Sequence, residues 1–182
     1  MKLIKDQVKK FIFLDRDGII NIDYGYTHKI ENFVFKSEIF HILEHFLDRN
    51  YEIIILTNQS GIGRSYYGED EYEILTNWMI KEFSKRKIKI TDVFHCPHSP
   101  DDNCLCRKPR IGLYEKASEI YKIDKEKSWS IGDNERDIIA SINFGIENTI
   151  LVNQSANADK SSSKIVLKSL VELQNLIDHG EF

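Results

Sequence analysis

The stretch FIFLDRDG, residues 11–18, joins a short apolar run to a turn that carries two carboxylates. An uninterrupted apolar run of this length is typical of a strand that is buried on both faces of a parallel sheet. The runs EIIIL at 52–56, WSI at 129–131 and TILV at 149–152 have the same character, and residues 92–95 predict one more strand. The sequence therefore predicts a mostly parallel sheet.

Helical patterns separate these strands. Apolar residues recur at helical spacing over 39–47, a helix with an acidic first turn is expected to begin near residue 69, and 113–121 and 135–144 predict two more helices. The tail predicts a short strand and a last helix, after a polar loop at 153–163. This alternation predicts an α/β, Rossmann-like fold with helices on both faces. Ligands of such sheets bind beyond the carboxyl ends of the strands.

Length and composition narrow the class of protein. We expect one domain over residues 1–182, because 182 residues with 41% hydrophobic and 30% charged side chains suit a single core. A formal charge of −4 argues against general nucleic-acid binding. The basic N-terminus has no apolar signal core, so we interpret it as a polar lead-in to the first strand and not as a signal peptide. We expect the protein to be a monomer in the cytoplasm.

Four aspartates follow two of the predicted strands. Asp15 and Asp17 lie in the turn after FIFL, and Asp133 and Asp137 follow WSI. Two carboxylates this close repel each other unless a divalent cation binds them or one is protonated. One could attack phosphorus while another exchanges protons, with Asp133 completing a magnesium site. The alternatives are an acidic surface turn for DRDG and a helix-start role for Asp137.

Phosphate-binding groups are expected near these carboxylates. The segment LTNQSGIGR after the second strand offers the Thr57 hydroxyl, amide side chains and backbone N–H groups. Arg107 and Lys108 supply positive charge that suits a phosphate. An ordinary turn and a solvated basic patch remain the alternatives for these two segments.

The three cysteines lie within eleven residues of one another, in an irregular stretch. Cys96-Pro-His98 and Cys104-Leu-Cys106 form two ligand pairs that together suit tetrahedral Zn²⁺. No coordination position would stay open, so the ion would be structural and would hold the loop 95–107 inserted beside Arg107. Free thiols, or His95 in place of His98, are the alternatives.

The segments FLDRDGIINIDYGY, LTNQSGIGR, CPH with CLCRKP, and SIGDNERD occur in this order within residues 11–152. Together they resemble the haloacid dehalogenase superfamily of aspartate-nucleophile phosphatases. Within it, the chain is most similar to the D-glycero-D-manno-heptose 1,7-bisphosphate phosphatase group and to the related histidinol-phosphate phosphatases. The resemblance implies a minimal cap and hydrolysis of the 7-phosphate through an aspartyl-phosphate.

The same resemblance implies a role for each motif. Asp15 would be the nucleophile and Asp17 the acid/base, while Thr57 and Lys108 would hold the phosphoryl group. Magnesium would bind the Asp15 carboxylate, the Asp17 backbone carbonyl and Asp133. The resemblance also places zinc on the cysteine pairs. The substrate-side candidates are Asp23, Tyr26, Asn58, Gln59, Ser60, Arg107 and Asn134.

The chain departs from its relatives at two points. Asn134 stands where close relatives carry a lysine directly after the fourth-motif aspartate, and the span between the two zinc-ligand pairs is shorter than in several relatives. Three alternative functions stay open at this point. They are a histidinol-phosphate phosphatase, a zinc-stabilised binding module without turnover, and, more remotely, a phosphatase of nucleic-acid ends.

Overall fold

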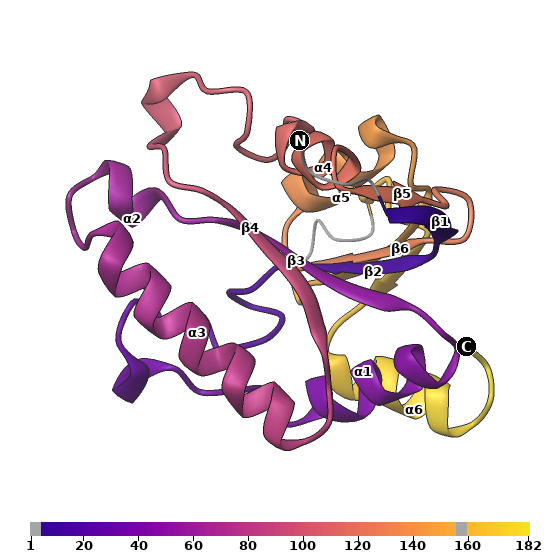
Figure 1. Cartoon of the computed structure of the whole chain (residues 1–182). Coiled ribbons are helices and arrows are strands. Elements are labelled where there is room, and N and C mark those ends of the chain that lie inside the picture. The colour runs from indigo at the N-terminus through magenta and orange to yellow at the C-terminus, as the bar shows by residue number, and fades with distance from the viewer. Residues whose placement is uncertain (1–4, 156–159) are drawn as a thin grey trace.

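The computed structural model (Figure 1) describes residues 5–155 and 160–182. It contains a six-stranded parallel sheet in the order β4-β3-β2-β6-β7-β8. Its strands are β2 (Phe11–Leu14), β3 (Glu52–Asn58), β4 (Ile90–Cys96), β6 (Trp129–Gly132), β7 (Asn148–Val152) and β8 (Ile165–Leu167). The predicted parallel sheet is confirmed. The predicted polar loop at 153–163 is described only in part, since residues 156–159 lie outside the described ranges.

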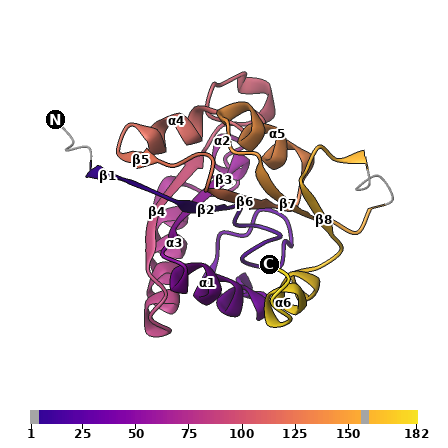
Figure 2. The same ribbon diagram turned by 90° about the vertical axis from the view of Figure 1, so that its right-hand side faces the viewer.

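Helices cover both faces of the sheet, and Figure 2 shows the resulting three layers. The α-helices are α1 (Glu38–Asp48), α2 (Ser60–Gly63), α3 (Glu69–Lys85), α4 (Gly112–Ser118), α5 (Glu135–Phe144) and α6 (Leu170–Asp178), with short 3₁₀ turns η1 (Ile30–Asn32) and η2 (Pro100–Asp102). The core with α1, α3 and α6 takes Ile12 and Leu14 of β2, whereas the core with α4 and α5 takes Phe11 and Phe13. Alternate side chains of a strand point to opposite faces, which is why β2 needs four apolar residues in a row.

Two predictions about the periphery of the sheet are wrong. The lead-in is itself a strand, β1 (Lys5–Lys9), and it pairs in parallel with β5 (Tyr121–Ile123) in a small second sheet. The helix expected over 113–121 consequently ends at Ser118. Tyr121 is buried, and its ring lies 5.6 Å from that of Phe11, so packing against the main sheet outweighs the helical pattern here.

The sheet order places three of the predicted motifs next to one another. β2 lies between β3 and β6, and all three are parallel, so Asp15, Thr57 and Asp133 lie at or just beyond one edge of the sheet. Within residues 5–155 and 160–182, no helix is both long and apolar enough to cross a membrane.

Candidate active site

Asp15 lies at the centre of the carboxyl edge, directly after β2, and is 7% exposed. Its backbone N–H donates to the carbonyl of Ile131 in β6 at 3.0 Å, so the turn continues the sheet by one residue. Gly18 then brings the chain back against Asp133. A Cβ atom at Gly18 would lie 2.1 Å from Asp133 Oδ2, and φ at Gly18 is +85°. Only glycine permits this approach.

Lys108 joins two of the aspartates. Its side chain is 3% exposed. Its ammonium group lies 3.1 Å from Asp15 Oδ1 and 2.7 Å from Asp137 Oδ1, and it donates to the carbonyl of Leu56 at 2.6 Å. The Asn58 side chain holds the Lys108 backbone, because its amide donates to the carbonyl at 3.2 Å and its oxygen accepts from the N–H at 3.1 Å. The loop after β4 is thereby fixed to the end of β3.

Asp137 has the helix-start position that the sequence offered as an alternative, and it also contacts Lys108. It is 2% exposed, and its Oδ2 accepts from the backbone N–H of Asn134 at 3.2 Å, as expected at the start of a helix. Its other oxygen faces Lys108. The residue therefore both caps α5 and orients the lysine.

The carboxylates of Asp15, Asp133 and Asp137 offer oxygens that lie within 4.8 Å of one another. Burial, helped by the neighbouring carboxylates, raises the pKa of Asp15 to about 7 against the opposing charge of Lys108. Burial likewise raises the pKa of Asp133 to about 6. Asp133 Oδ1 is buried and has no hydrogen-bond partner among the described residues. An orphaned acceptor in a cluster of excess negative charge fits a hard cation such as Mg²⁺.

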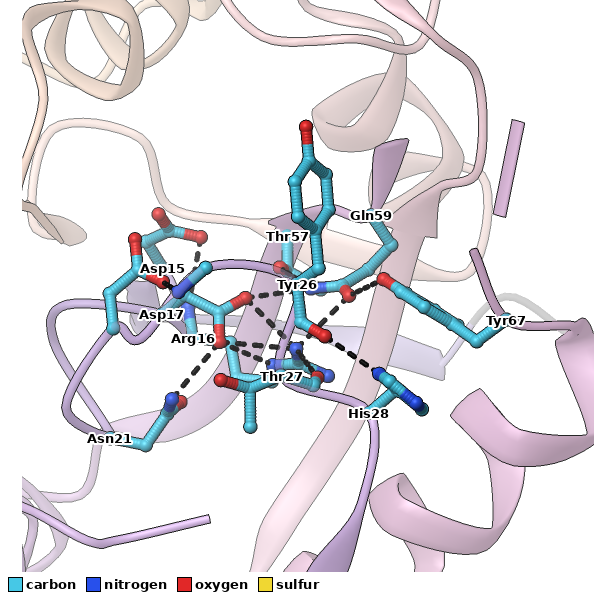
Figure 3. A network of polar contacts seen from close by, with 12 residues as sticks. Asp15, Arg16, Asp17, Asn21, Tyr26, Thr27, His28, Thr57, Gln59 and Tyr67 are labelled. Atoms are coloured by element: carbon cyan, nitrogen blue, oxygen red, sulfur yellow. Dashed lines mark hydrogen bonds and ion pairs between the residues drawn. The ribbon is translucent and has the colours of Figure 1, made fainter. Parts of the chain in front are cut away.

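The side chain of Asp17 lies in a different set of contacts, which Figure 3 shows. Its Oδ1 accepts from Arg16 Nε at 3.2 Å and from Asn21 Nδ2 at 3.0 Å, and its Oδ2 accepts from Arg16 Nη2 and Gln59 Nε2 at 2.9 Å each. The expectation that Asp17 would offer magnesium its backbone carbonyl, and not its carboxylate, is compatible with this arrangement.

Arg16 and Gln59 are the centre of this network. Arg16 is 1% exposed, and its Nη2 also donates to the carbonyl of Thr27 at 2.7 Å. Gln59 Nε2 donates to Thr57 Oγ1 at 2.7 Å, and its Oε1 accepts from the Tyr67 hydroxyl at 2.6 Å. Burial raises the pKa of Tyr67 to about 12, so this phenol stays a hydrogen-bond donor. No sequence pattern indicates Arg16 or Tyr67, because both act through contacts that only the folded chain creates.

A pocket of about 300 Å³ opens above Asp15 and Asp17. Six of the predicted substrate-side residues line it, namely Asp23, Tyr26, Asn58, Gln59, Ser60 and Arg107. Asn134 is not among the lining residues. Its side chain accepts from the backbone N–H of Arg136 at 3.2 Å and caps α5. Two further arginines that the sequence analysis did not single out, Arg64 and Arg136, line the pocket instead.

The structure brings the four predicted zinc ligands together. Cys96 Sγ lies 3.5 Å from Cys104 Sγ and 3.6 Å from His98 Nδ1, while Cys106 Sγ lies 3.3 Å from His98 Nδ1 and 3.7 Å from Cys104 Sγ. Ligands of a tetrahedral zinc ion lie about 3.4–3.8 Å apart, so the cluster fits that ion. His95 points elsewhere, since its Nε2 is 2.9 Å from Glu69 Oε2.

The layered parallel sheet, with buried acidic groups at the ends of β2 and β6 and a lysine between them, defines a phosphatase of the haloacid dehalogenase type. A solved structure agrees: the D,D-heptose 1,7-bisphosphate phosphatase from B. bronchiseptica, complexed with magnesium and phosphate, matches with a TM-score of 0.80 and 26% identity over 94% of this chain and 99% of that one. The chain belongs to the family described as polynucleotide kinase 3 phosphatase, whose model matches residues 10–175.

Two proteins named as heptose-1,7-bisphosphate 7-phosphatases are similar in sequence to this chain. The D-glycero-alpha-D-manno-heptose-1,7-bisphosphate 7-phosphatase of Campylobacter jejuni is 48% identical over 145 residues, which cover 80% of this chain and 83% of the relative. The D-glycero-beta-D-manno-heptose-1,7-bisphosphate 7-phosphatase of Helicobacter pylori strain J99 is 40% identical over 80% of this chain and 84% of its own length.

Proposed function

We propose that the protein is a magnesium-dependent phosphatase that hydrolyses the 7-phosphate of a D-glycero-D-manno-heptose 1,7-bisphosphate. The observation that carries the chemistry is Asp15, buried beside Lys108 at the base of a polar pocket. The substrate is proposed from the relatives, of which one acts on the alpha and another on the beta anomer by name. A monomeric protein in the cytoplasm remains part of the same prediction.

The reaction requires two displacements at phosphorus. An oxygen of Asp15 forms a bond to phosphorus while the ester P–O bond breaks, and Asp17 gives the leaving sugar oxygen its proton. Asp17 then takes a proton from water, whose oxygen attacks the phospho-aspartate and releases inorganic phosphate. Arg16, Gln59 and Asn21 hold both oxygens of Asp17, so a proton on this carboxyl must displace one of those donors.

Side chains around Asp15 are suited to the negative charge of the phosphoryl group. Lys108 lies 3.1 Å from Asp15 Oδ1, and Thr57 lies near the end of the adjacent strand β3. Both side chains are proposed to hold the phosphoryl oxygens. Magnesium is proposed to bind Asp15, Asp133 and the Asp17 backbone carbonyl, and when bound it neutralises charge on the phosphate. Zinc is proposed on Cys96, His98, Cys104 and Cys106, where it serves the loop and not the reaction.

Substitution of the proposed nucleophile tests the chemistry. We expect Asp15→Asn to lower Mg²⁺-dependent phosphate release by at least about 10³-fold, because the amide cannot form the covalent intermediate. Glu44→Gln, in the exposed part of α1, is the matched control for loss of a carboxylate. Activity of Asp15→Asn within tenfold of the wild type would exclude this residue as the nucleophile.

A substrate panel tests the specificity. It contains both heptose 1,7-bisphosphate anomers, histidinol phosphate and a 3′-phosphorylated oligonucleotide, since the family description includes polynucleotide phosphatases. We expect one of the heptose bisphosphates to have the highest kcat/KM. A higher value for histidinol phosphate or for the oligonucleotide would replace the proposed substrate but leave the chemistry in place. Bound zinc without any magnesium-dependent release would favour a binding module.

A further inference from the structure

Three arginines line the pocket without an ion pair of their own. They are Arg64 after α2, Arg107 in the loop after β4, and Arg136 in the first turn of α5. Within residues 5–155 and 160–182, no salt bridge or side-chain hydrogen bond joins any of their guanidinium groups to another residue. By contrast, the two other cations at the site, Lys108 and Arg16, are each paired with an aspartate.

Two of these arginines carry buried donor atoms without an acceptor. Arg107 Nη1 and Arg136 Nε are shielded from solvent and have no hydrogen-bond partner among the described residues. A buried donor that lacks an acceptor is unfavourable, and more so when it is charged. An anionic group in the pocket would satisfy both atoms. Arg64 is exposed, so this argument applies to Arg107 and Arg136 alone.

The two arginines reach the pocket from opposite sides of Asp15. Arg107 follows β4, which lies beyond β3 on one side of β2, whereas Arg136 follows β6 on the other side. Lys108 contacts Asp15 and Asp137 and is the cation already proposed to hold the reacting phosphoryl group. The unpaired guanidinium groups therefore exceed what a single phosphoryl group over Asp15 requires.

Arg136 supplies a positive charge in the turn where Asn134 stands in place of the relatives' lysine. The Asn134 side chain is committed to the cap of α5 and does not line the pocket. The positive charge from this turn comes two residues later, from Arg136, which lines the pocket.

We propose that Arg136 is a specificity-determining residue that binds, together with Arg107, the second phosphate of a sugar bisphosphate while the first lies over Asp15. A planar guanidinium group can donate two parallel hydrogen bonds to phosphate oxygens, which favours a phosphate over a neutral hydroxyl at this position. This inference rests on the proposed function and adds to it the group that selects a bisphosphate.

The test compares two substrates that differ only in the second phosphate, heptose 1,7-bisphosphate and heptose 7-phosphate. We expect Arg136→Gln to lower kcat/KM for the bisphosphate about 10- to 100-fold, chiefly through KM, and to change it less than about threefold for the 7-phosphate. Arg136→Lys keeps the positive charge but not the two parallel donors. Its kcat/KM for the bisphosphate is expected to lie between those of the wild type and Arg136→Gln. Lys81→Gln, an exposed cation of α3, is the control for loss of charge and should behave as wild type.

Each outcome bears on the inference separately from the proposed function. An equal loss on both substrates in Arg136→Gln and Arg136→Lys would overturn it, since the residue would then act on the reacting phosphate or on folding. Unchanged preference for the bisphosphate in Arg136→Gln would also overturn it. If the wild-type protein releases no phosphate from either substrate with magnesium, the proposed function itself fails.

Discussion

The cysteine cluster and the aspartate cluster are built in opposite ways. The four proposed zinc ligands lie within residues 96–106, so the end of β4 and the loop that follows it carry the whole set. The three clustered aspartates lie at positions 15, 133 and 137, and the lysine between them comes from position 108. The first cluster needs only this short segment of the chain, whereas the second forms only when β2, β3 and β6 lie side by side.

This difference has an energetic consequence. In the aspartate cluster each charge depends on another, because Lys108 lies between two buried carboxylates and is itself 3% exposed. Removal of one partner leaves a buried charge without compensation, which costs more than the pair contributes. In the cysteine cluster the ligands are proposed to depend on zinc and on one another. The cluster is joined to the pocket through the adjacent Arg107 and through the backbone N–H of Gln59, which donates to the Cys96 carbonyl at 2.7 Å.

Lys108→Met is expected to have the largest effect. Phosphate release should fall by about 10³-fold or more, and the free energy of unfolding by about 3–5 kcal/mol, because Asp15 and Asp137 lose their shared cation. Urea denaturation and phosphate release measure the two effects, with Lys81→Met as the control. The double variant Asp15→Asn/Lys108→Met should recover part of the lost stability. Strictly additive effects would contradict the view that these residues act as one unit.

Cys106→Ser should have an intermediate effect. The substitution removes one of four ligands, so zinc content should fall while the main sheet persists, and kcat/KM should drop about tenfold because Arg107 and Lys108 lose their support. Metal analysis, circular dichroism and kinetics measure these three properties. Leu105→Ser is the matched control, since this side chain is 77% exposed in the same loop. Full activity in a zinc-free protein would show that the loop is held without the ion.

The same difference explains what the sequence could and could not predict. The cysteine and histidine pairs and the helix at 135–144 are local patterns. The structure brings the four side chains of the pairs together, and it confirms the helix as α5. The pairing of β1 with β5 joins segments more than 100 residues apart, and the run KDQVK carries no alternation that would indicate it. Arg136 lies within a motif that the sequence analysis used, but only the geometry of α5 shows that its side chain reaches the pocket.

The orientation of the Asp17 side chain could not be predicted from the sequence, for a related reason. Spacing alone predicts that Asp15 and Asp17 point into one crevice, and both line the pocket. The side chain that holds Asp17, however, is the intervening Arg16, which is buried by contacts with Gln59 and Thr27. Such a contact depends on tertiary packing between distant segments, and no local pattern of residues encodes it.

Asp133→Asn is expected to have the smallest effect on stability and to reveal the repulsion within the aspartate cluster. Because burial raises the pKa of Asp133 from 3.8 to about 6, the folded protein binds this proton more tightly than the unfolded chain does. The contribution of Asp133 to the stability of the magnesium-free protein should therefore fall as pH rises from about 4 to 6 and be lost above that range.

The neutral amide introduced by Asp133→Asn cannot ionise, so the substitution removes this pH-dependent loss of stability. In magnesium-free buffer at pH 7.5, Asp133→Asn should be about 1–2 kcal/mol more stable than the wild type, a value reduced from the full shift because the group is partly solvated. At pH 4 the difference should vanish, and saturating magnesium should reverse its sign, since the ion binds the wild type more tightly. Urea denaturation at the two pH values, with and without the ion, gives these differences. A variant that is less stable than the wild type at pH 7.5 without magnesium would mean that Asp133 is held by contacts within the protein and not strained in preparation for a cation.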